Sequence, residues 1–196
     1  MLFDTAAEWH AALNDLPPAL LLASVIFDWL GSATKRDSLK AAGFWALVAG
    51  VAGAALAVTS GLLAEGSIEH GETVHRVMER HETWAIAVGV GFALLAAWRI
   101  WRKGVLGPQE RPTYLLAATA GALGIIYVAH LGGTIVFRHA GGVPTSALQE
   151  ALSERTQTHE HAPGEEHEEG VPPDSAAAKA DTGHTHAPGT PPHDHD

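Results

Sequence analysis

Residues 41–63 read AAGFWALVAGVAGAALAVTSGLL and contain no charged side chain. An α-helix needs about 20 apolar residues to cross the hydrocarbon core of a bilayer, so this segment is long enough to span it. Residues 84–101 and 114–137 are two further apolar stretches of comparable length. The sequence therefore predicts three transmembrane helices from residue 41 onward.

A fourth span precedes these three. Residues 17–30 are apolar but short, and extension back to residue 13 gives a spanning length, with Pro17 and Pro18 expected to kink its outer end. Thr5 and Glu8 have capping-box spacing and predict a short interfacial helix before it. The expected fold is an all-α integral membrane protein: a four-transmembrane-helix bundle over residues 1–143, with spans at about 13–30, 41–63, 84–101 and 114–137.

Lysine and arginine residues predict how these spans are oriented. Seven lie in the connections that follow the first and third spans: Lys35, Arg36, Lys40, Arg99, Arg102, Lys103 and Arg111. The N-terminal segment has none, and the connection over residues 64–83 has two among five glutamates. Since basic loops stay on the cytoplasmic side, we expect a bacterial inner-membrane protein with both termini outside, in the periplasm.

The chain changes composition beyond the last span. Ser146 and Gln149 have capping-box spacing, which predicts a short helix over residues 144–155. Residues 156–196 have almost no large apolar side chain and hold nine acidic residues against one basic residue, so we expect a disordered acidic tail. A chain with this charge is a poor binder of nucleic acid, and we expect no such partner.

The absence of cysteine limits the cofactors that the chain can hold. It excludes thiolate zinc sites, iron–sulfur clusters and covalently attached c-type haem. Any haem or metal ion must therefore be held by histidine, methionine or carboxylate ligands.

The predicted topology brings six histidines to one membrane face: His10, His70, His75, His81, His130 and His139. His130 carries the most weight, because its predicted place inside a span makes an ionisable side chain costly. Tyr127 and Thr134 share its helix face and are placed to orient its ring, while Gly132 and Gly133 leave room for a flat macrocycle. We consider three roles for His130: a haem or metal ligand, a neutral histidine hydrogen-bonded across helices, or a proton-handling group.

Haem b requires axial ligands from facing helices, and His81 or His10 is the expected partner of His130. His75 and His139 are further candidate ligands for a metal ion. For each of these four partners and candidates, a solvated interfacial imidazole is the alternative.

Two acidic residues flank the first span. Asp15 lies near the histidine layer and could accept a hydrogen bond from a ligand. Asp28, beside Trp29 near the cytoplasmic end, is expected to be an interfacial or capping residue.

Three His-x-His pairs lie in the tail: His159 and His161, His184 and His186, and His193 and His195. In a flexible acidic chain such pairs chelate Zn²⁺, Cu²⁺ or Ni²⁺ weakly and with little selectivity. The alternative is a solvated spacer that binds no metal.

Two stretches of the chain resemble an uncharacterised bacterial membrane family, the domain of unknown function 2231. Residues 10–28 read HAALNDLPPALLLASVIFD, and residues 127–143 read YVAHLGGTIVFRHAGGV. These are similar to the opening and closing segments of that family, and the resemblance covers roughly residues 8–143. Ala11 stands where the family usually has proline, and Asp15 stands where it has a second histidine.

The resemblance implies a four-span bundle with a layer of histidines on the periplasmic side. Some members of that family are fused to Rieske-type redox domains, which favours electron transfer. If the family's second histidine is a ligand, this chain either uses a carboxylate there or lacks the site.

Three functions fit these observations. The first is a redox protein that holds haem b or a metal ion at the histidine layer and exchanges electrons with periplasmic or membrane redox proteins. The second is a metal-handling accessory that uses the tail as a periplasmic chelator, and the third is a structural membrane subunit without a cofactor. Nothing resembles a hydrolase triad, a phosphate loop or a redox cysteine pair, so we expect no independent enzymatic activity.

Overall fold

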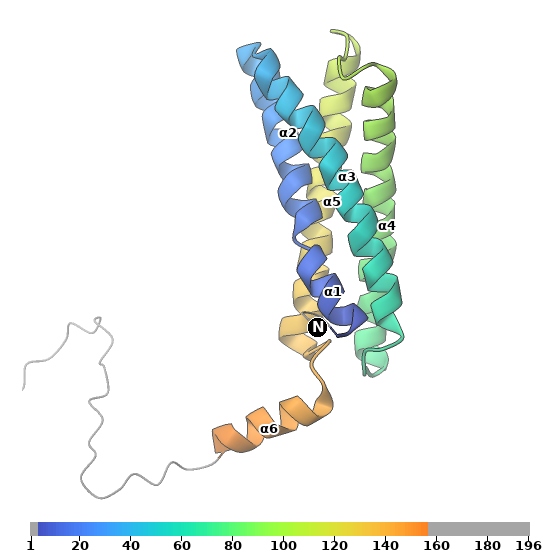
Figure 1. Ribbon diagram of the computed structural model, residues 1–196, viewed down its shortest axis with the longest axis vertical. Coiled ribbons are helices and arrows are strands. Elements are labelled where there is room, and N and C mark those ends of the chain that lie inside the picture. Colours follow the sequence, from blue (N-terminus) through green and yellow to red (C-terminus); the bar gives the residue numbers. More distant parts are fainter. Residues whose placement is uncertain (1–3, 157–196) are drawn as a thin grey trace, which may run out of the picture. The chain divides into compact units, whose positions relative to one another are not determined.

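The computed structural model describes residues 4–156 (Figure 1). Within this range the helices are α1 (Ala6–Leu13), α2 (Leu16–Thr34), α3 (Asp37–Glu65), α4 (Glu72–Trp101), α5 (Glu110–His139) and α6 (Thr145–Thr156). Four stretches are long and apolar enough to cross a membrane: Ala6–Thr34, Asp37–Glu65, Glu72–Trp101 and Glu110–His139. The predicted all-α membrane bundle with four spans is confirmed.

The first span consists of α1 and α2 together. Thr5 Oγ1 accepts a hydrogen bond from the Glu8 N–H at 3.2 Å, and the Glu8 carboxylate accepts one from the Thr5 N–H at 3.2 Å, which confirms the predicted capping box. The helix breaks between Leu13 and Leu16 and restarts with proline in its first turn, where a missing N–H is tolerated. α1 is therefore a separate short helix, and it packs against α3.

The spans form a ring in which α2 packs on α3, α3 on α4, α4 on α5 and α5 on α2 (Figure 1). Glycine allows close approach within two of these pairs. A Cβ on Gly50 of α3 would lie 2.6 Å from Leu21 of α2, and a Cβ on Gly121 of α5 would lie 2.7 Å from Phe92 of α4.

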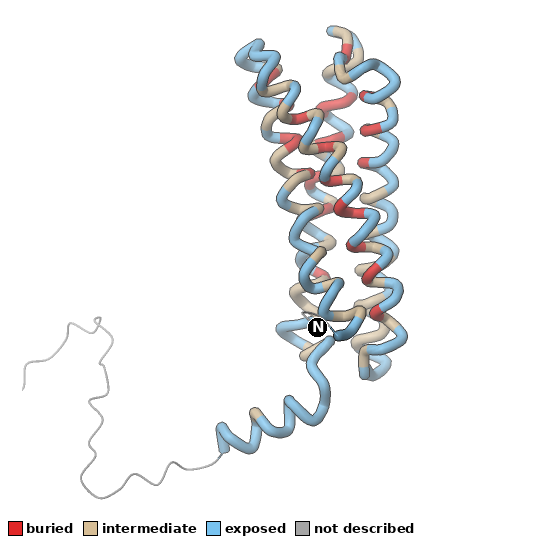
Figure 2. The backbone as a smooth tube through the Cα atoms, in the orientation of Figure 1, coloured by how far each residue is buried: buried red, intermediate tan, exposed pale blue. Residues whose placement is uncertain are grey.

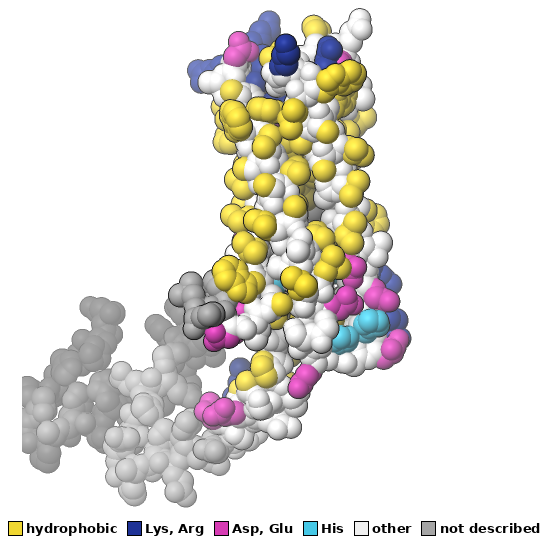
Figure 3. Space-filling model, turned by 45° about the vertical axis from the view of Figure 1, so that its right-hand side comes forward, with side chains coloured by type: hydrophobic (Ala, Val, Ile, Leu, Met, Phe, Trp, Pro, Cys, Tyr) yellow, Lys and Arg dark blue, Asp and Glu magenta, His cyan; other side chains and the backbone are white. Residues whose placement is uncertain are grey.

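Buried residues follow the inside of the ring as a narrow line (Figure 2), to which Leu21, Leu47 and Phe92 belong. Large apolar side chains cover the outside as well (Figure 3), and Leu94 and Leu116 are among those exposed. An apolar outer surface is what contact with lipid tails requires.

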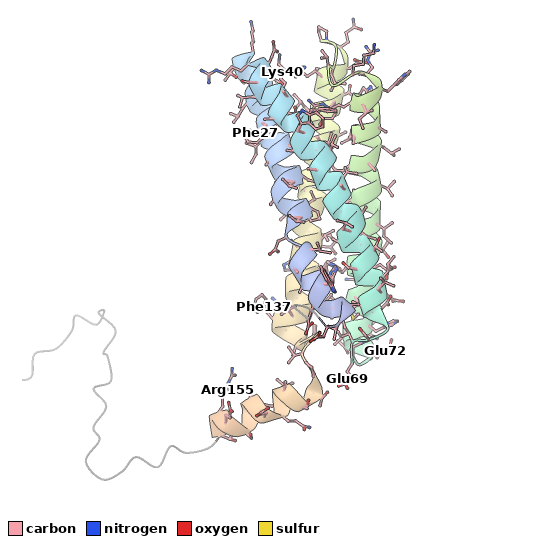
Figure 4. The ribbon with its side chains drawn as sticks, in the orientation of Figure 1. Phe27, Lys40, Glu69, Glu72, Phe137 and Arg155 are labelled. Carbon is pink, nitrogen blue, oxygen red and sulfur yellow. The ribbon has the colours of Figure 1, made fainter. Side chains whose placement is uncertain are left out.

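Charged side chains gather at the two ends of the bundle (Figures 3 and 4). The basic end consists of the α2–α3 and α4–α5 connections and includes Lys40. The histidine end consists of α1, the α3–α4 connection with Glu69, and the end of α5. α3, α4 and α5 contain 29, 30 and 30 residues, so each is longer than the roughly 20 residues that the hydrocarbon core requires.

Candidate functional site

His10 of α1 and His81 of α4 lie at the histidine end of the bundle. His10 Nδ1 is 2.9 Å from the Ala57 carbonyl oxygen of α3, and His81 Nδ1 is 3.0 Å from the Val128 carbonyl oxygen of α5. A carbonyl oxygen can only accept, so each Nδ1 carries the proton and each Nε2 keeps a lone pair. Both rings are half-buried.

Each imidazole sits over a glycine that lies one helical turn beyond its carbonyl partner. Gly61 follows Ala57 by four residues, and Gly132 follows Val128 by four. A Cβ on Gly61 would lie 3.0 Å from His10 Cε1. A Cβ on Gly132 would lie 3.2 Å from His81 Cε1. Both contacts are tighter than an ordinary Cβ contact, so glycine is what allows each ring to reach its carbonyl.

A constant shift of 71 residues relates the two histidine seats: His10 to His81, Ala57 to Val128 and Gly61 to Gly132. The histidine and its carbonyl partner are 47 residues apart in both. The same shift takes the contact between Gly50 and Leu21 to the contact between Gly121 and Phe92. The bundle is therefore two similar helical hairpins, α1–α3 and α4–α5, related by an approximate twofold axis along the bundle.

His130 lies on the exposed side of α5. The Thr134 hydroxyl donates to the main-chain carbonyl of His130 at 2.9 Å, and Tyr127 packs edge-on against Trp84 with ring centroids 5.3 Å apart. Neither side chain orients the His130 ring as the sequence suggested. The structure places His10 and His81 in similar surroundings at the same end of the bundle and leaves His130 on the outside.

His130 lies at the level of charged residues of α4. Its neighbour Val128 bonds to His81, which lies between the charged residues Arg80 and Glu82. This level is about 20 helical residues from the basic end, which is about the length that the hydrocarbon core requires. The charged residues of α4 at this level argue against treating His130 as an isolated ionisable group inside the hydrocarbon.

His70 and His75 form a second pair beside the start of α4. His70 Nε2 and His75 Nδ1 are 3.2 Å apart, and the rings stack at 11° with centroids 5.3 Å apart. His75 Nε2 lies 3.5 Å from the Glu79 carboxylate, and His139 is the half-buried last residue of α5.

A preformed site with three or more metal-ligating side chains does not occur within residues 4–156. The predicted tail ligands lie outside the described residues: His159, His161, His184, His186, His193 and His195.

The basic end contains a buried ionic cluster that the sequence interpretation missed. Arg99 Nη1 is 2.6 Å from Asp28 Oδ2, and the Tyr114 hydroxyl donates to the same oxygen at 2.9 Å. Arg99 also donates to the Lys40 carbonyl at 2.9 Å and lies over the rings of Tyr114 and Phe44. Asp28 and Arg99 are 1% and 2% exposed, so together with Tyr114 they form an ionic lock inside the bundle.

Two expectations are corrected by this ionic lock. Asp28 is not an interfacial or capping residue, because it pairs across the bundle with a residue 71 positions away. Arg99 is not part of a basic loop, because it is buried within α4, and this leaves six basic residues in the two connections and the first turns of α3 and α5. A signal was present in the sequence: Asp28 and Arg99 are opposite charges at similar distances from the same end of two apolar spans.

Comparison with known proteins agrees with this architecture. The family described as Predicted membrane protein (DUF2231) matches residues 7–145, which include all four spans apart from Ala6. No curated protein and no solved structure matches the chain. The chain therefore belongs to the DUF2231 family of predicted membrane proteins.

Proposed function

We propose that this protein binds haem b or a transition-metal ion through His10 and His81 and passes electrons to a periplasmic or membrane redox protein. The observation that carries this proposal is the matching contact of each Nδ1 with a main-chain carbonyl oxygen. Each donates Nδ1–H to a main-chain carbonyl of a neighbouring helix, which leaves Nε2 as a ligand. A fixed Nδ1–H is the usual support of a metal-bound histidine, because it orients the ring and raises the basicity of Nε2.

The number of ligands favours haem b over a bare ion. Two histidine nitrogens would be enough to hold haem b, and the twofold relation supplies two equivalent ones from separate hairpins. A zinc ion held by this pair would need further ligands, such as water, because zinc takes four. When bound, the haem iron would supply the one-electron chemistry, while the chain orients the two imidazoles.

The proposed location is the inner membrane of a bacterium, with both termini in the periplasm. The six basic residues of the two connections and of the helix turns that follow them support this orientation even without Arg99. It would place His10 and His81 near the periplasmic surface, within reach of a soluble redox partner.

The test uses the full chain, produced with ample haem and metal and purified in detergent. We expect a Soret band that is lost in His10→Ala and in His81→Ala. His130→Ala is the matched control, because it removes an imidazole at the same level, and it should keep the band. A band that survives both substitutions, or is lost only in His130→Ala, would contradict the proposal.

Two other results would favour the alternatives. Bound metal without a chromophore, lost when the tail histidines are replaced, would support the metal-handling accessory. A protein that is empty under these conditions would support the structural subunit.

A further inference from the structure

We infer that His70 and His75 form a second metal site, separate from the proposed haem or metal site, that takes a divalent transition-metal ion such as Zn²⁺ or Cu²⁺. The two nitrogens that face each other, His70 Nε2 and His75 Nδ1, are 3.2 Å apart. Two nitrogens bound to one tetrahedral zinc at 2.0–2.1 Å would be about 3.3 Å apart. The pair therefore already has the spacing of two adjacent ligands.

Hydrogen bonding fixes how His70 would act. Its Nδ1 is 2.6 Å from the Ile68 carbonyl oxygen, so Nδ1 carries the proton and Nε2 has the lone pair. Without a metal, this lone pair accepts the Nδ1–H of His75. The main-chain carbonyl thus supports His70 in the way that acceptors support metal-bound histidines.

The carboxylate of Glu79 completes the arrangement for His75. It lies 3.5 Å from His75 Nε2, on the opposite side of the ring from His70. When a metal ion binds between the two nitrogens, the proton on Nδ1 of His75 is transferred to its Nε2. The Glu79 carboxylate can then accept a hydrogen bond from that Nε2–H. No proton is lost, and both ligands then have an acceptor on their far nitrogen.

This pair is not required by the architecture of the bundle. The shift of 71 residues takes His70 to Gly141 and His75 to Ser146, so the second hairpin has no equivalent pair. Both histidines lie outside the buried core, and His70 is exposed, so water can fill the remaining coordination positions.

The experiment uses the full chain with alanine at the seven tail histidines: His159, His161, His167, His184, His186, His193 and His195. Zn²⁺ binding is measured by calorimetry in detergent. We expect one ion at this pair, and its affinity should fall about tenfold or more in His70→Ala and in His75→Ala, and about tenfold in Glu79→Gln. His130→Ala is the control, because it removes an exposed imidazole that belongs to neither proposed site, and it should bind Zn²⁺ as the parent does.

Two comparisons keep this result separate from the proposed function. The Zn²⁺ affinity of the pair should be the same when His10 and His81 are also alanine, so failure of one site does not imply failure of the other. With Cu²⁺, electron paramagnetic resonance should show two nitrogen ligands in the parent and one in each single variant. Unchanged Zn²⁺ affinity in His70→Ala and His75→Ala, or no binding by the parent, would overturn the inference.

Discussion

The two ends of the bundle hold pairs of residues at equivalent positions, and the pairs behave differently. Asp28 and Arg99 are related by the same shift of 71 residues as His10 and His81. The first pair consists of opposite charges that bond to each other, and it is almost completely buried. The second consists of identical rings that bond to carbonyls instead, and it is only half-buried. The same approximate twofold relation thus holds for an ionic lock at one end and, at the other, for the lone pairs of His10 Nε2 and His81 Nε2.

The difference shows how a repeated hairpin can acquire two roles. Opposite charges at equivalent positions satisfy each other, so their contribution is to hold the hairpins together. Two identical imidazoles whose Nδ1 protons are already engaged cannot both donate to one another, so their Nε2 atoms suit a third group that accepts two lone pairs. Stability should therefore depend mainly on the basic end, and ligand binding on the histidine end.

The largest effect on stability should come from breaking the ionic lock. Arg99→Met leaves the Asp28 carboxylate buried without its cation, and we expect a loss of about 3–5 kcal/mol in the free energy of unfolding. The measurement is unfolding of the purified protein in mixed detergent. Arg102→Met removes an exposed ion pair with Glu110 and should change stability far less.

A double variant tests whether Asp28 and Arg99 stabilise the bundle through their interaction with each other. Asp28→Leu combined with Arg99→Met removes both charges, and replacement of both members of a buried pair is much less harmful than loss of one. The double variant should therefore be more stable than Arg99→Met alone. If the two losses simply add, Asp28 and Arg99 do not stabilise the bundle as a pair.

The next effect concerns the close approach of α2 and α3 at the lock. Gly43→Ala would place a Cβ 2.6 Å from Asp28 Oδ1, and such overpacking typically costs about 1–3 kcal/mol. Gly89→Ala is the matched control in α4, because nothing lies within 4 Å of the added Cβ, and there alanine should be neutral or slightly stabilising. Equal melting temperatures for the two variants would mean that α2 and α3 are not this close.

The histidine end should be less sensitive. His10→Ala and His81→Ala each remove a hydrogen bond to a carbonyl, and His10→Ala also removes the 3.3 Å contact of Nδ1 with Ser60 Oγ; we expect each substitution to cost about 1 kcal/mol. In protein without haem or metal the two losses should be similar, because the seats are equivalent, and they should add in the double variant. In protein with the ligand bound they should be strongly non-additive, since either substitution already abolishes the shared site. Additive losses in both forms would show that the two rings do not share a ligand.

The sequence alone predicted the spans and the gathering of histidines, because both depend on local composition and on the order of elements along the chain. It did not predict the partners. Asp28 was interpreted as interfacial because the residue that pairs with it is 71 positions away, and His130 was favoured because its distance from the end of its span was visible whereas its helix face was not.

A repeat signal was nevertheless present in the sequence. Glu8-x-His10 recurs as Glu79-x-His81, and the pair Gly50 and Gly53 recurs as Gly121 and Gly124. These few sequence matches are weak evidence for an internal repeat by themselves. They become convincing because the contacts that the matching residues make are related by the same shift of 71 residues. The packing of the two hairpins thus establishes the repeat that the sequence pattern alone left ambiguous.

The smallest effect should be confined to α1. Thr5→Ala removes the side-chain oxygen that accepts the Glu8 N–H, and loss of an N-cap typically costs about 1 kcal/mol. Because α1 carries His10 but no part of the ionic lock, hydrogen exchange should increase in α1 and stay unchanged around Asp28 and Arg99. Ligand binding should weaken modestly, since the cap helps hold the ring of His10 over α3. Exchange that rises equally at both ends would mean that the lock and the histidine seats unfold as one unit, and that the two ends do not divide stability and binding between them.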